Sequence, residues 1–466
     1  MDVIGIILSL LLLIFVAYRG FSVILFAPVF ALAAAALQGL PIMPSYTELF
    51  MAKTVIYIKA FFPIFILGAV FGQVMESTLL VKGISHAMMK RLGHKHAILA
   101  VVLSCAILTY GGVSLFVIVF AVYPLAAALY KEAGIPKRLI PGSICLGSGT
   151  FTMDAIPGTP QIQNIIPTSF YGTTTYAAPI AGLLGGGLIF AVGMWWLESR
   201  RKKAAAQGEG YGTHTLNEPG TPENVELPKW YVAILPLVAV LILNFVLSRL
   251  VKWSPDSFGP IAGMNIPLMA SDVTKVLGIW SLIIALVCGI MLALALGFRN
   301  VQQSGGFQKA LNTGAIGSLL AIMNTASMVG YGNVIAALPG FKSIANSLLA
   351  IRLGGTPLLS EAISVTSLAG ITGSASGGLS IALDLMAKDW LGWARSVGLS
   401  PEMLHRVASM ASGGIDSLPH NGAIITLLAV CGLTHKQSYF DIGVITVIKT
   451  LMVFVVILFY SLTGIY

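Results

Sequence analysis

The sequence predicts an all-α polytopic membrane protein. Of its 466 residues, 56% are hydrophobic and 10% are charged, whereas a soluble domain carries roughly a quarter charged residues. Several apolar stretches approach the about 20 residues that a bilayer core requires. They contain Gly and Pro throughout, and no series of about ten-residue alternating segments separates them, so a helical bundle is favoured over a membrane barrel.

The apolar stretches account for the predicted spans, and the clearest lie at 4–18, 21–40, 231–250, 276–296 and 444–462. The first follows no basic segment and ends without a small-residue cleavage pattern, so we expect a retained span and not a signal peptide. Four cysteines lie in apolar segments without the spacing of metal ligands, and we expect them to be packing residues. They are Cys105, Cys145, Cys288 and Cys431.

The charge distribution indicates which loops face the cytoplasm. The net charge is +9, from 27 Lys and Arg against 18 Asp and Glu, and much of the excess lies in short loops beside apolar stretches. That is the positive-inside pattern of membrane proteins, so no nucleic-acid partner is expected. The longest polar segment, 199–228, begins with four basic residues. We expect it to be a cytoplasmic linker between two membrane repeats, 1–198 and 229–466.

An internal repeat supports this division. Three short signatures of the first half recur in the second half in the same order and at similar spacing, so a chance match is improbable. They are GQVM at 72–75 and GNVI at 332–335, GGVS at 111–114 and GGLS at 377–380, and DAIP at 154–157 and DSLP at 416–419.

The repeat and the basic loops together predict the topology. Segment 96–130 is apolar, has basic residues on both sides and is interrupted by glycines, so we expect a re-entrant helical hairpin. Segment 139–168 is expected to cross the membrane with a break at 154–160. Five crossings plus a hairpin make the second repeat inverted relative to the first. Its hairpin is expected at about 358–389 and its broken span at about 403–433, with both termini outside.

Breaks in membrane helices suggest an ion- or substrate-binding centre. They leave N–H groups at half-helix N-termini and carbonyls at C-termini, which suit an anion and a cation respectively. Small polar residues that suit a hydroxylated carboxylate surround the predicted breaks. Alternatively, such residues only allow close helix packing. The candidate substrate-binding residues are Gly111, Gly112, Ser114, Thr152, Thr159, Gln161, Ser376, Gly377, Gly378, Ser380, Ser417, His420 and Asn421.

The candidate proton-coupling residues are Asp154, Asp416 and His420. The two aspartates are equivalent in the repeat, and an ionisable group inside the membrane suggests a function because its burial is costly. A second interpretation is that each aspartate is the N-cap of the helix after its break. For His420 two interpretations stand: a group able to gain and lose a proton near neutral pH, or a satisfied buried histidine. Glu361 and Asp384 in the second hairpin rank below these residues.

No enzyme signature or phosphate-binding loop is found in the sequence, so ATP-driven transport and catalysis are not expected. No cofactor or metal is expected either. A secondary carrier is favoured over an ion channel or a receptor that binds a ligand without transport, because inverted repeats provide alternating access around a site at the midplane.

The sequence resembles the gluconate permease (GntP) family of the ion transporter superfamily. The resemblance covers nearly the whole chain. It is carried by ALQG at 36–39, GAVFG at 68–72, KRLGHKH at 90–96 and PGTP at 157–160. It implies proton symport of gluconate or related hydroxy acids through the inner membrane. By superfamily likeness it also implies a homodimer whose transport domains move as an elevator.

Two departures from the gluconate carriers and one likeness to another branch refine the expected substrate. Gluconate carriers have an acidic residue at the first hairpin tip, where this chain has YGG at 110–112, and a His-Pro-Gly-Pro run where this chain has IPGTP at 156–160. The segment GGIDSLPHN at 413–421 looks more like the D-3-hydroxybutyrate permease branch. A short hydroxy monocarboxylate is therefore expected, with gluconate as the alternative. Sodium coupling remains an alternative to proton coupling.

Overall fold

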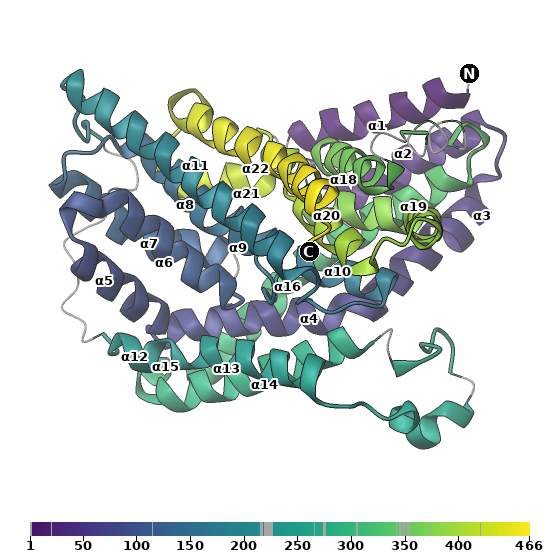
Figure 1. Cartoon of the computed structure of the whole chain (residues 1–466), viewed down its shortest axis with the longest axis horizontal. Helices are drawn as coiled ribbons and strands as arrows, with labels where there is room; N and C mark the ends of the chain where they lie inside the picture. The colour runs from purple at the N-terminus through teal and green to yellow at the C-terminus, as the bar shows by residue number, and fades with distance from the viewer. Residues whose placement is uncertain are drawn as a thin grey trace.

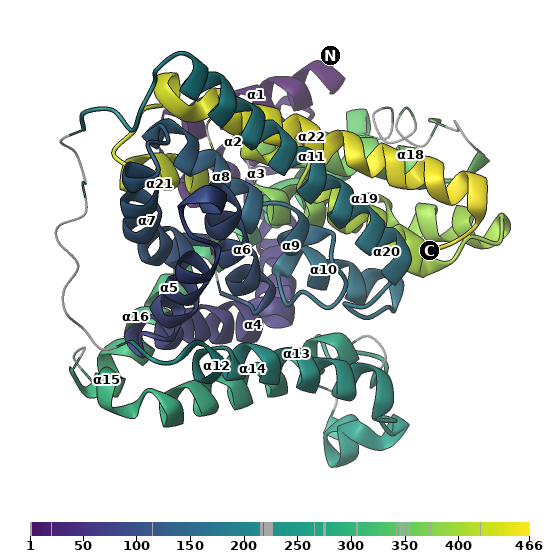
Figure 2. The ribbon, with the colours of Figure 1, turned by 60° about the vertical axis from the view of Figure 1, so that its left-hand side comes forward.

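The computed structural model describes residues 2–19, 21–113, 115–214, 218, 227–264, 266–273, 276–303, 306–341, 343, 347, 350–351, 355–372, 374–419 and 421–466. Within this part of the chain all regular structure is helical and no strand occurs. The predicted all-α class is therefore confirmed. The helices form one bundle in which α11 and α22 lie side by side across one face (Figures 1 and 2).

The first half contains two initial helices, a long helix, a helix pair and a broken helix. Glycine ends several of these elements, for example at Gly112, whose φ of +98° favours a residue without a Cβ. In order they are α1 (Asp2–Tyr18), α2 (Val23–Leu37), α3 (Ile42–Pro44), α4 (Met51–Ser77), α5 (Leu80–Leu92), α6 (Ala97–Tyr110), α7 (Leu115–Glu132), α8 (Ile140–Ser148), α9 (Phe151–Asp154), α10 (Ile162–Tyr171) and α11 (Pro179–Ala206).

The second half repeats this order of a long helix, a helix pair, a broken helix and a final long helix. In order the elements are α12 (Trp230–Ala233), α13 (Leu235–Phe245), α14 (Leu277–Leu296), α15 (Phe298–Gln303), α16 (Gly306–Ala337), α18 (Leu358–Thr372), α19 (Ala375–Ser396), α20 (Pro401–Ser412), a short 3-10 turn (Ile415–Ser417), α21 (Gly422–Val430) and α22 (His435–Thr463). The pair α6–α7 lies in the predicted hairpin segment 96–130, and α18–α19 begins at Leu358 and continues to Ser396.

Six helical segments of the described chain have the length and apolar character needed to cross a bilayer. They are Ile42–Ser77, Pro179–Ala206, Trp230–Ser248, Leu277–Leu296, Gly306–Ile335 and His435–Thr463. Shorter apolar helices include α2 and α6. The chain is therefore a multi-pass membrane protein.

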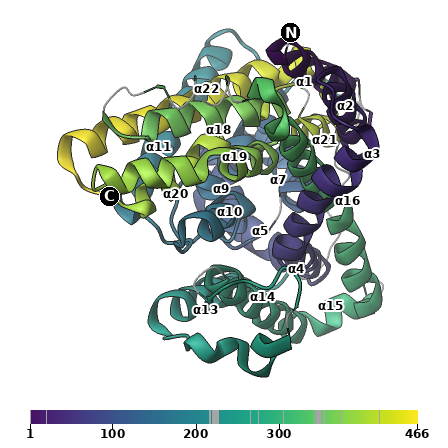
Figure 3. The ribbon, with the colours of Figure 1, turned by 90° about the vertical axis from the view of Figure 1, so that its right-hand side faces the viewer.

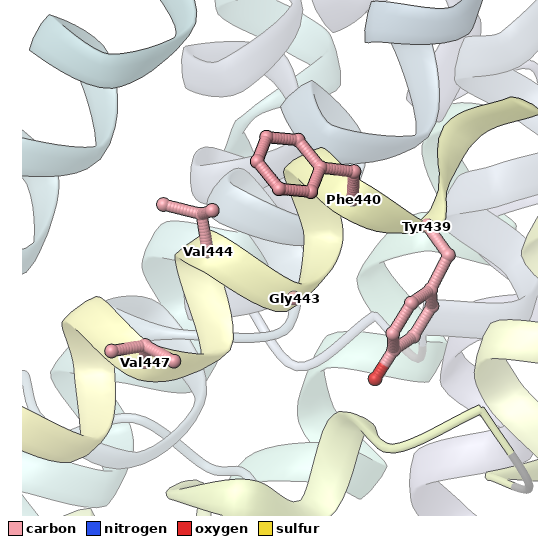
Figure 4. A pocket seen from close by; sticks show the side chains of 5 residues that line it. All are labelled: Tyr439, Phe440, Gly443, Val444 and Val447. Atoms are coloured by element: carbon pink, nitrogen blue, oxygen red, sulfur yellow. The ribbon is translucent and has the colours of Figure 1, made fainter.

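Exposed apolar stripes mark the outside of the bundle. On α22, Phe440, Val447, Leu451 and Leu458 are each more than half exposed and recur at helical spacing, as a lipid-facing surface requires. A shallow apolar depression lies on the same helix, lined by Tyr439, Phe440, Gly443, Val444 and Val447. Figure 4 shows Tyr439 pointing away from Phe440.

The long helix of each half forms the inner scaffold. Helix α16 packs along α4 and also contacts α2. Helices α13 and α14 pack against each other, and α14 also contacts α4, so that they form a layer along one edge of the bundle (Figure 3). The broken helices lie inside, covered by α11 and α22. This arrangement buries the breaks within protein, and membrane proteins tolerate non-helical backbone at depth where it is buried in this way or lines a water-filled cavity.

Candidate functional site

The first broken helix is held by the tip of the α6–α7 pair. The Gln161 side-chain amide donates to the Thr109 carbonyl at 2.8 Å, and the Tyr110 hydroxyl donates to the Pro157 carbonyl at 2.8 Å. A Cβ on Gly112 would meet Pro160 at 3.1 Å. The tip and the break therefore pack directly on each other, and freed backbone carbonyls of both elements find donors there.

The second break contains a buried ion pair. Lys449 Nζ on α22 lies 2.6 Å from Asp416 Oδ1, and the two residues are 2% and 7% exposed. The Ser417 hydroxyl donates to the same carboxylate oxygen at 2.8 Å. Asn421 donates to the Asp416 carbonyl at 2.9 Å, and its side-chain oxygen caps α21 by accepting from the Ala423 and Ile424 N–H groups.

The two breaks meet at the centre of the bundle. Lys449 also donates to the carbonyl of Gly149, where α8 ends, at 3.1 Å. From the second half, the Ser409 hydroxyl donates to the Asp154 carbonyl at 2.7 Å. The Asp154 carboxylate faces Gly413 so closely that a Cβ on that glycine would overlap it. Residues separated by more than 250 positions thus share one buried polar centre.

Arg406 joins the same elements from the second half, and it is fully buried. Its guanidinium makes five hydrogen bonds, to the carbonyls of Ala177, Thr175 and Asp154 and to the Asn164 side-chain oxygen, with two of them reaching Ala177. A guanidinium has five N–H donors, so every donor is used. Arg406 therefore connects the two halves of the chain by hydrogen bonds, and its guanidinium has no donor free for a ligand.

Next to Arg406, a histidine and an amide extend the network. His405 is fully buried, and its two ring nitrogens lie 2.6 Å from Thr173 Oγ1 and 3.1 Å from Asn164 Oδ1. The Asn164 amide donates to the carbonyls of Thr159 and Thr175. The loops on both sides of α10 are therefore fixed to α20 by side chains.

The predicted site residues of the first half divide into bonded and unpaired groups. The Thr152 hydroxyl donates to the Gly147 carbonyl of its own broken helix. The Thr159 hydroxyl and Asp154 Oδ2 are buried and have no hydrogen-bond partner within the described chain. Gly111 packs against Leu237, which a Cβ would overlap. Ser114 lies outside the described residues.

The predicted site residues of the second helix pair contact α16 and one another. Ser376 faces Thr325 of α16 at 3.4 Å, and the Ser380 hydroxyl donates to the Ser376 carbonyl. The Gly377 N–H donates to Ser374, the N-cap of α19. Gly378 lies against the backbone of Ala369 in the other arm of the pair. The structure brings Ser417 and Asn421 to Asp416, whereas His420 lies outside the described residues.

The geometry does not support the interpretation that the aspartates are helix caps. Asn421 caps α21, while α10 begins after Gln161 without a side-chain cap. Asp416 instead holds Lys449. The cap residue is the asparagine five positions beyond Asp416 because only there does the chain re-enter helical geometry.

Sequence reasoning missed Lys449 and Arg406. Both are basic residues in segments that the sequence marks as membrane-embedded, and an ionisable group there is a functional signal in itself. Lys449 lies within the apolar stretch 444–462, and the high mean hydropathy of that stretch gives no sign of a single basic residue in it. Of the residues ranked lower, Asp384 pairs with Lys53 at 2.7 Å. Glu361 is fully buried and accepts a hydrogen bond from Tyr171.

A second charged cluster lies where α8, α11 and α22 come together at one end of the bundle. Asp441 Oδ1 accepts from Arg200 Nε at 2.9 Å, and Asp441 Oδ2 accepts from Arg138 at 3.2 Å. Arg138 also pairs with Glu209 of the linker at 2.7 Å. Hydrogen bonding to Arg138 lowers the pKa of Glu209 below its ordinary value. The cluster therefore fastens the linker to the ends of three helices.

Within the described residues, no group of three or more His, Cys, Asp or Glu side chains is placed to hold a metal ion. The polar centre contains instead two carboxylates, one ammonium and one guanidinium. Such a centre can bind protons and exchange partners within an ion pair.

No protein-family model matches the chain. The fold is similar to the crystal structure of the YdaH transporter of Alcanivorax borkumensis, with a TM-score of 0.49 and 14% identity over 88% of this chain and 86% of that one. The sequence is 50% identical over 475 residues to the uncharacterized transporter YxjC of Bacillus subtilis (strain 168), and the match covers all of both proteins. The chain belongs to the transporter family that includes YxjC.

Proposed function

We propose that the chain is a secondary active transporter that imports a small hydroxy-carboxylate, similar to 3-hydroxybutyrate, together with protons. The observation that supports this most directly is the meeting of two helix breaks around Asp154, Asp416 and Lys449. Discontinuous helices near the midplane are where secondary carriers bind substrate and coupling ion. The chain would act in the inner membrane, with the linker in the cytoplasm and both termini outside.

The proposed substrate-binding region is the contact between the first helix pair and the first break. Two buried polar atoms there have no partner within the described chain, Thr109 Oγ1 and Thr159 Oγ1, and a third, Asp154 Oδ2, lies where the first break faces Gly413. Unpaired buried polar groups are costly, so a ligand hydroxyl or carboxyl group that reaches them when the tip separates from the break would gain hydrogen bonds. This favours a small hydroxylated ligand over an apolar one.

The size of the proposed substrate follows from the other contacts. Gln161 and Asn164 already use side-chain donors on backbone carbonyls, and Arg406 uses its donors on backbone carbonyls and on the Asn164 side-chain oxygen. Few groups remain for the five hydroxyls of a sugar acid, whereas a four-carbon hydroxy acid needs only a carboxylate partner and one or two hydroxyl partners. We therefore rank 3-hydroxybutyrate above gluconate.

The proposed proton carriers are the two aspartates. Asp416 is balanced by Lys449, whereas no described basic side chain forms an ion pair with Asp154. A buried carboxylate without an ion-pair partner is costly, so proton uptake by Asp154 would accompany substrate entry.

By likeness to the ion transporter superfamily, the domain that carries the breaks would move relative to α4 and α16 as an elevator within a homodimer.

The test is uptake into proteoliposomes. Labelled 3-hydroxybutyrate and gluconate are supplied under an imposed proton gradient, an imposed sodium gradient or neither. We expect 3-hydroxybutyrate to accumulate with the proton gradient alone. Accumulation driven only by sodium would overturn the coupling, gluconate accumulation in its place would overturn the substrate, and saturable binding without uptake would indicate a receptor.

Variants locate the coupling within the same assay. Asp154→Asn and Asp416→Asn are expected to abolish gradient-driven accumulation. Asp389→Asn is the matched control, because Asp389 is exposed near the C-terminal end of α19, and it is expected to behave as wild type. Full accumulation by both of the first two variants would show that protons are carried elsewhere.

A further inference from the structure

The Lys449 ammonium lies in a shell of oxygen atoms supplied by both breaks. Its three contacts are Asp416 Oδ1 at 2.6 Å, Ser417 Oγ at 3.0 Å and the Gly149 carbonyl at 3.1 Å. An ammonium group has three N–H donors, so each donor has one oxygen acceptor. The side chain is 2% exposed, which leaves the charge almost completely removed from solvent.

This oxygen shell has the composition of a monovalent-cation site. A carboxylate supplies a full negative charge, a hydroxyl supplies a lone pair, and Gly149 is the residue at which α8 ends, where the helix dipole is negative. In membrane carriers, carbonyls at half-helix C-termini coordinate the coupling sodium ion. The atoms that would bind such an ion are present here, and a covalently attached cation occupies the position between them.

We propose that Lys449 is a tethered cation that occupies a sodium-type site formed by Gly149, Asp416 and Ser417. This inference deepens the proposed function and rests on its premise that the helix breaks form the ion-binding centre. The lysine satisfies the site in every conformation that keeps α22 beside the second break. A free sodium ion therefore has no place there, and proton exchange is left as the means of changing the charge of the centre.

A prediction specific to this arrangement is that removing the lysine side chain creates a sodium site. Lys449→Ala exposes the oxygen shell and leaves a space in which an ion fits. Lys449→Met also removes the charge, but its long side chain continues to fill the space. Alanine and methionine should therefore differ in sodium response although both lack the ammonium group.

The experiment measures the thermal unfolding temperature of the full chain in detergent. Chloride salts of sodium, potassium and the large cation N-methyl-D-glucamine are compared at equal ionic strength. For Lys449→Ala we expect a saturable increase on the order of 2–4 °C in sodium over N-methyl-D-glucamine. Wild type and Lys449→Met should show no difference between these two salts. Lys449→Ala with Asp416→Asn should lose the response, because the charged ligand is gone.

Each outcome decides the proposal. A sodium-specific increase in wild type overturns it, as does an equal response of Lys449→Ala and Lys449→Met. If Lys449→Ala folds only when it is purified in sodium, the proposal is supported; if it fails to fold in both salts, the site does not take the ion and the proposal falls. The readout is binding, so a failure of carboxylate uptake would overturn the proposed substrate and leave this inference intact.

Discussion

The carboxylate of Asp154 lies directly against Gly413: a Cβ atom on Gly413 would stand 1.7 Å from Asp154 Oδ2. The two residues belong to the breaks of the two halves, so this contact sets how closely the breaks approach. Gly413 has a helical φ of −76°, and any residue can adopt that backbone. The position therefore requires glycine because of the space that Asp154 occupies and not because of backbone strain.

Gly413→Ala should separate the two breaks. We expect a loss of about 1–3 kcal/mol in unfolding free energy, the usual cost of overpacking. Gly422→Ala is the matched control, since a Cβ there meets no atom within 4 Å. The measurement is thermal unfolding in detergent. Adding Asp154→Ala to Gly413→Ala removes the clash and should recover much of the loss; an additive double variant would contradict the contact.

Arg406→Met should destabilise the protein strongly. It removes two hydrogen bonds to the buried Ala177 carbonyl and one each to the carbonyls of Thr175 and Asp154, which keep other donors. An unsatisfied buried polar group costs about 1–3 kcal/mol. A total loss above about 3 kcal/mol is expected.

Arg201→Met is the control for the Arg406 variant. Arg201 forms an i,i+3 pair with Glu198 in which both side chains are about one third exposed, and such pairs contribute about 0–1 kcal/mol. Thermal unfolding of both variants checks the contrast. Comparable losses would mean that the buried network contributes no more than a surface pair.

Glu361→Gln should be tolerated. Glu361 accepts from the Tyr171 hydroxyl, and its Oε2 has no partner in the described chain. A neutral side chain of the same shape keeps the acceptor, so we expect a change within about 1 kcal/mol. Glu361→Ala should cost about 2–5 kcal/mol, because it leaves a cavity and an orphaned tyrosine hydroxyl. Thermal unfolding separates the two, and a large loss for glutamine would indicate an ionised acid with a partner.

Acidification should release the linker from the bundle. Arg138 lowers the pKa of Glu209 below 4.5 in the folded protein, so the unfolded or undocked linker binds a proton more readily. The stabilisation is therefore present above pH 4.5 and is lost as the pH falls through the lowered pKa. An environment-sensitive dye on Gln207→Cys should report undocking below that pH. Glu209→Gln should show the undocked signal at neutral pH, and a signal independent of pH in wild type would refute the docking role.

The helical class and the order of the helices could be predicted from the sequence, because the length of each apolar stretch and the positions of glycine and proline determine where helices begin and end. Gly149 and Pro157, for example, lie where the first broken helix stops and where its loop runs. The two aspartates of the candidate site were also accessible, since a carboxylate in an apolar segment is conspicuous. Their partners were not, because each partner comes from a distant part of the chain.

Lys449 illustrates why the rest could not be predicted. Its contact with Gly149 joins residues 300 positions apart, and no local pattern encodes such a distance. Ser376 illustrates a second limit. It lies beside Thr325 of α16, and the repeat signature that marks it carries no information on this neighbour. Repeat symmetry predicts which segments correspond but not which face of each helix a neighbour covers.

Most of the Arg406 donors bind backbone carbonyls of the first half, and this has a consequence for biosynthesis. Ala177 is made 229 residues before Arg406, which at about 5–20 residues per second is roughly 10–50 s of translation. During that interval the carbonyls of Ala177 and Asp154 in the newly inserted first half lack the donors that Arg406 supplies. Water, lipid headgroups or an insertion factor must shield them until the ribosome delivers the arginine, so folding of this protein within the membrane is completed only near the end of synthesis.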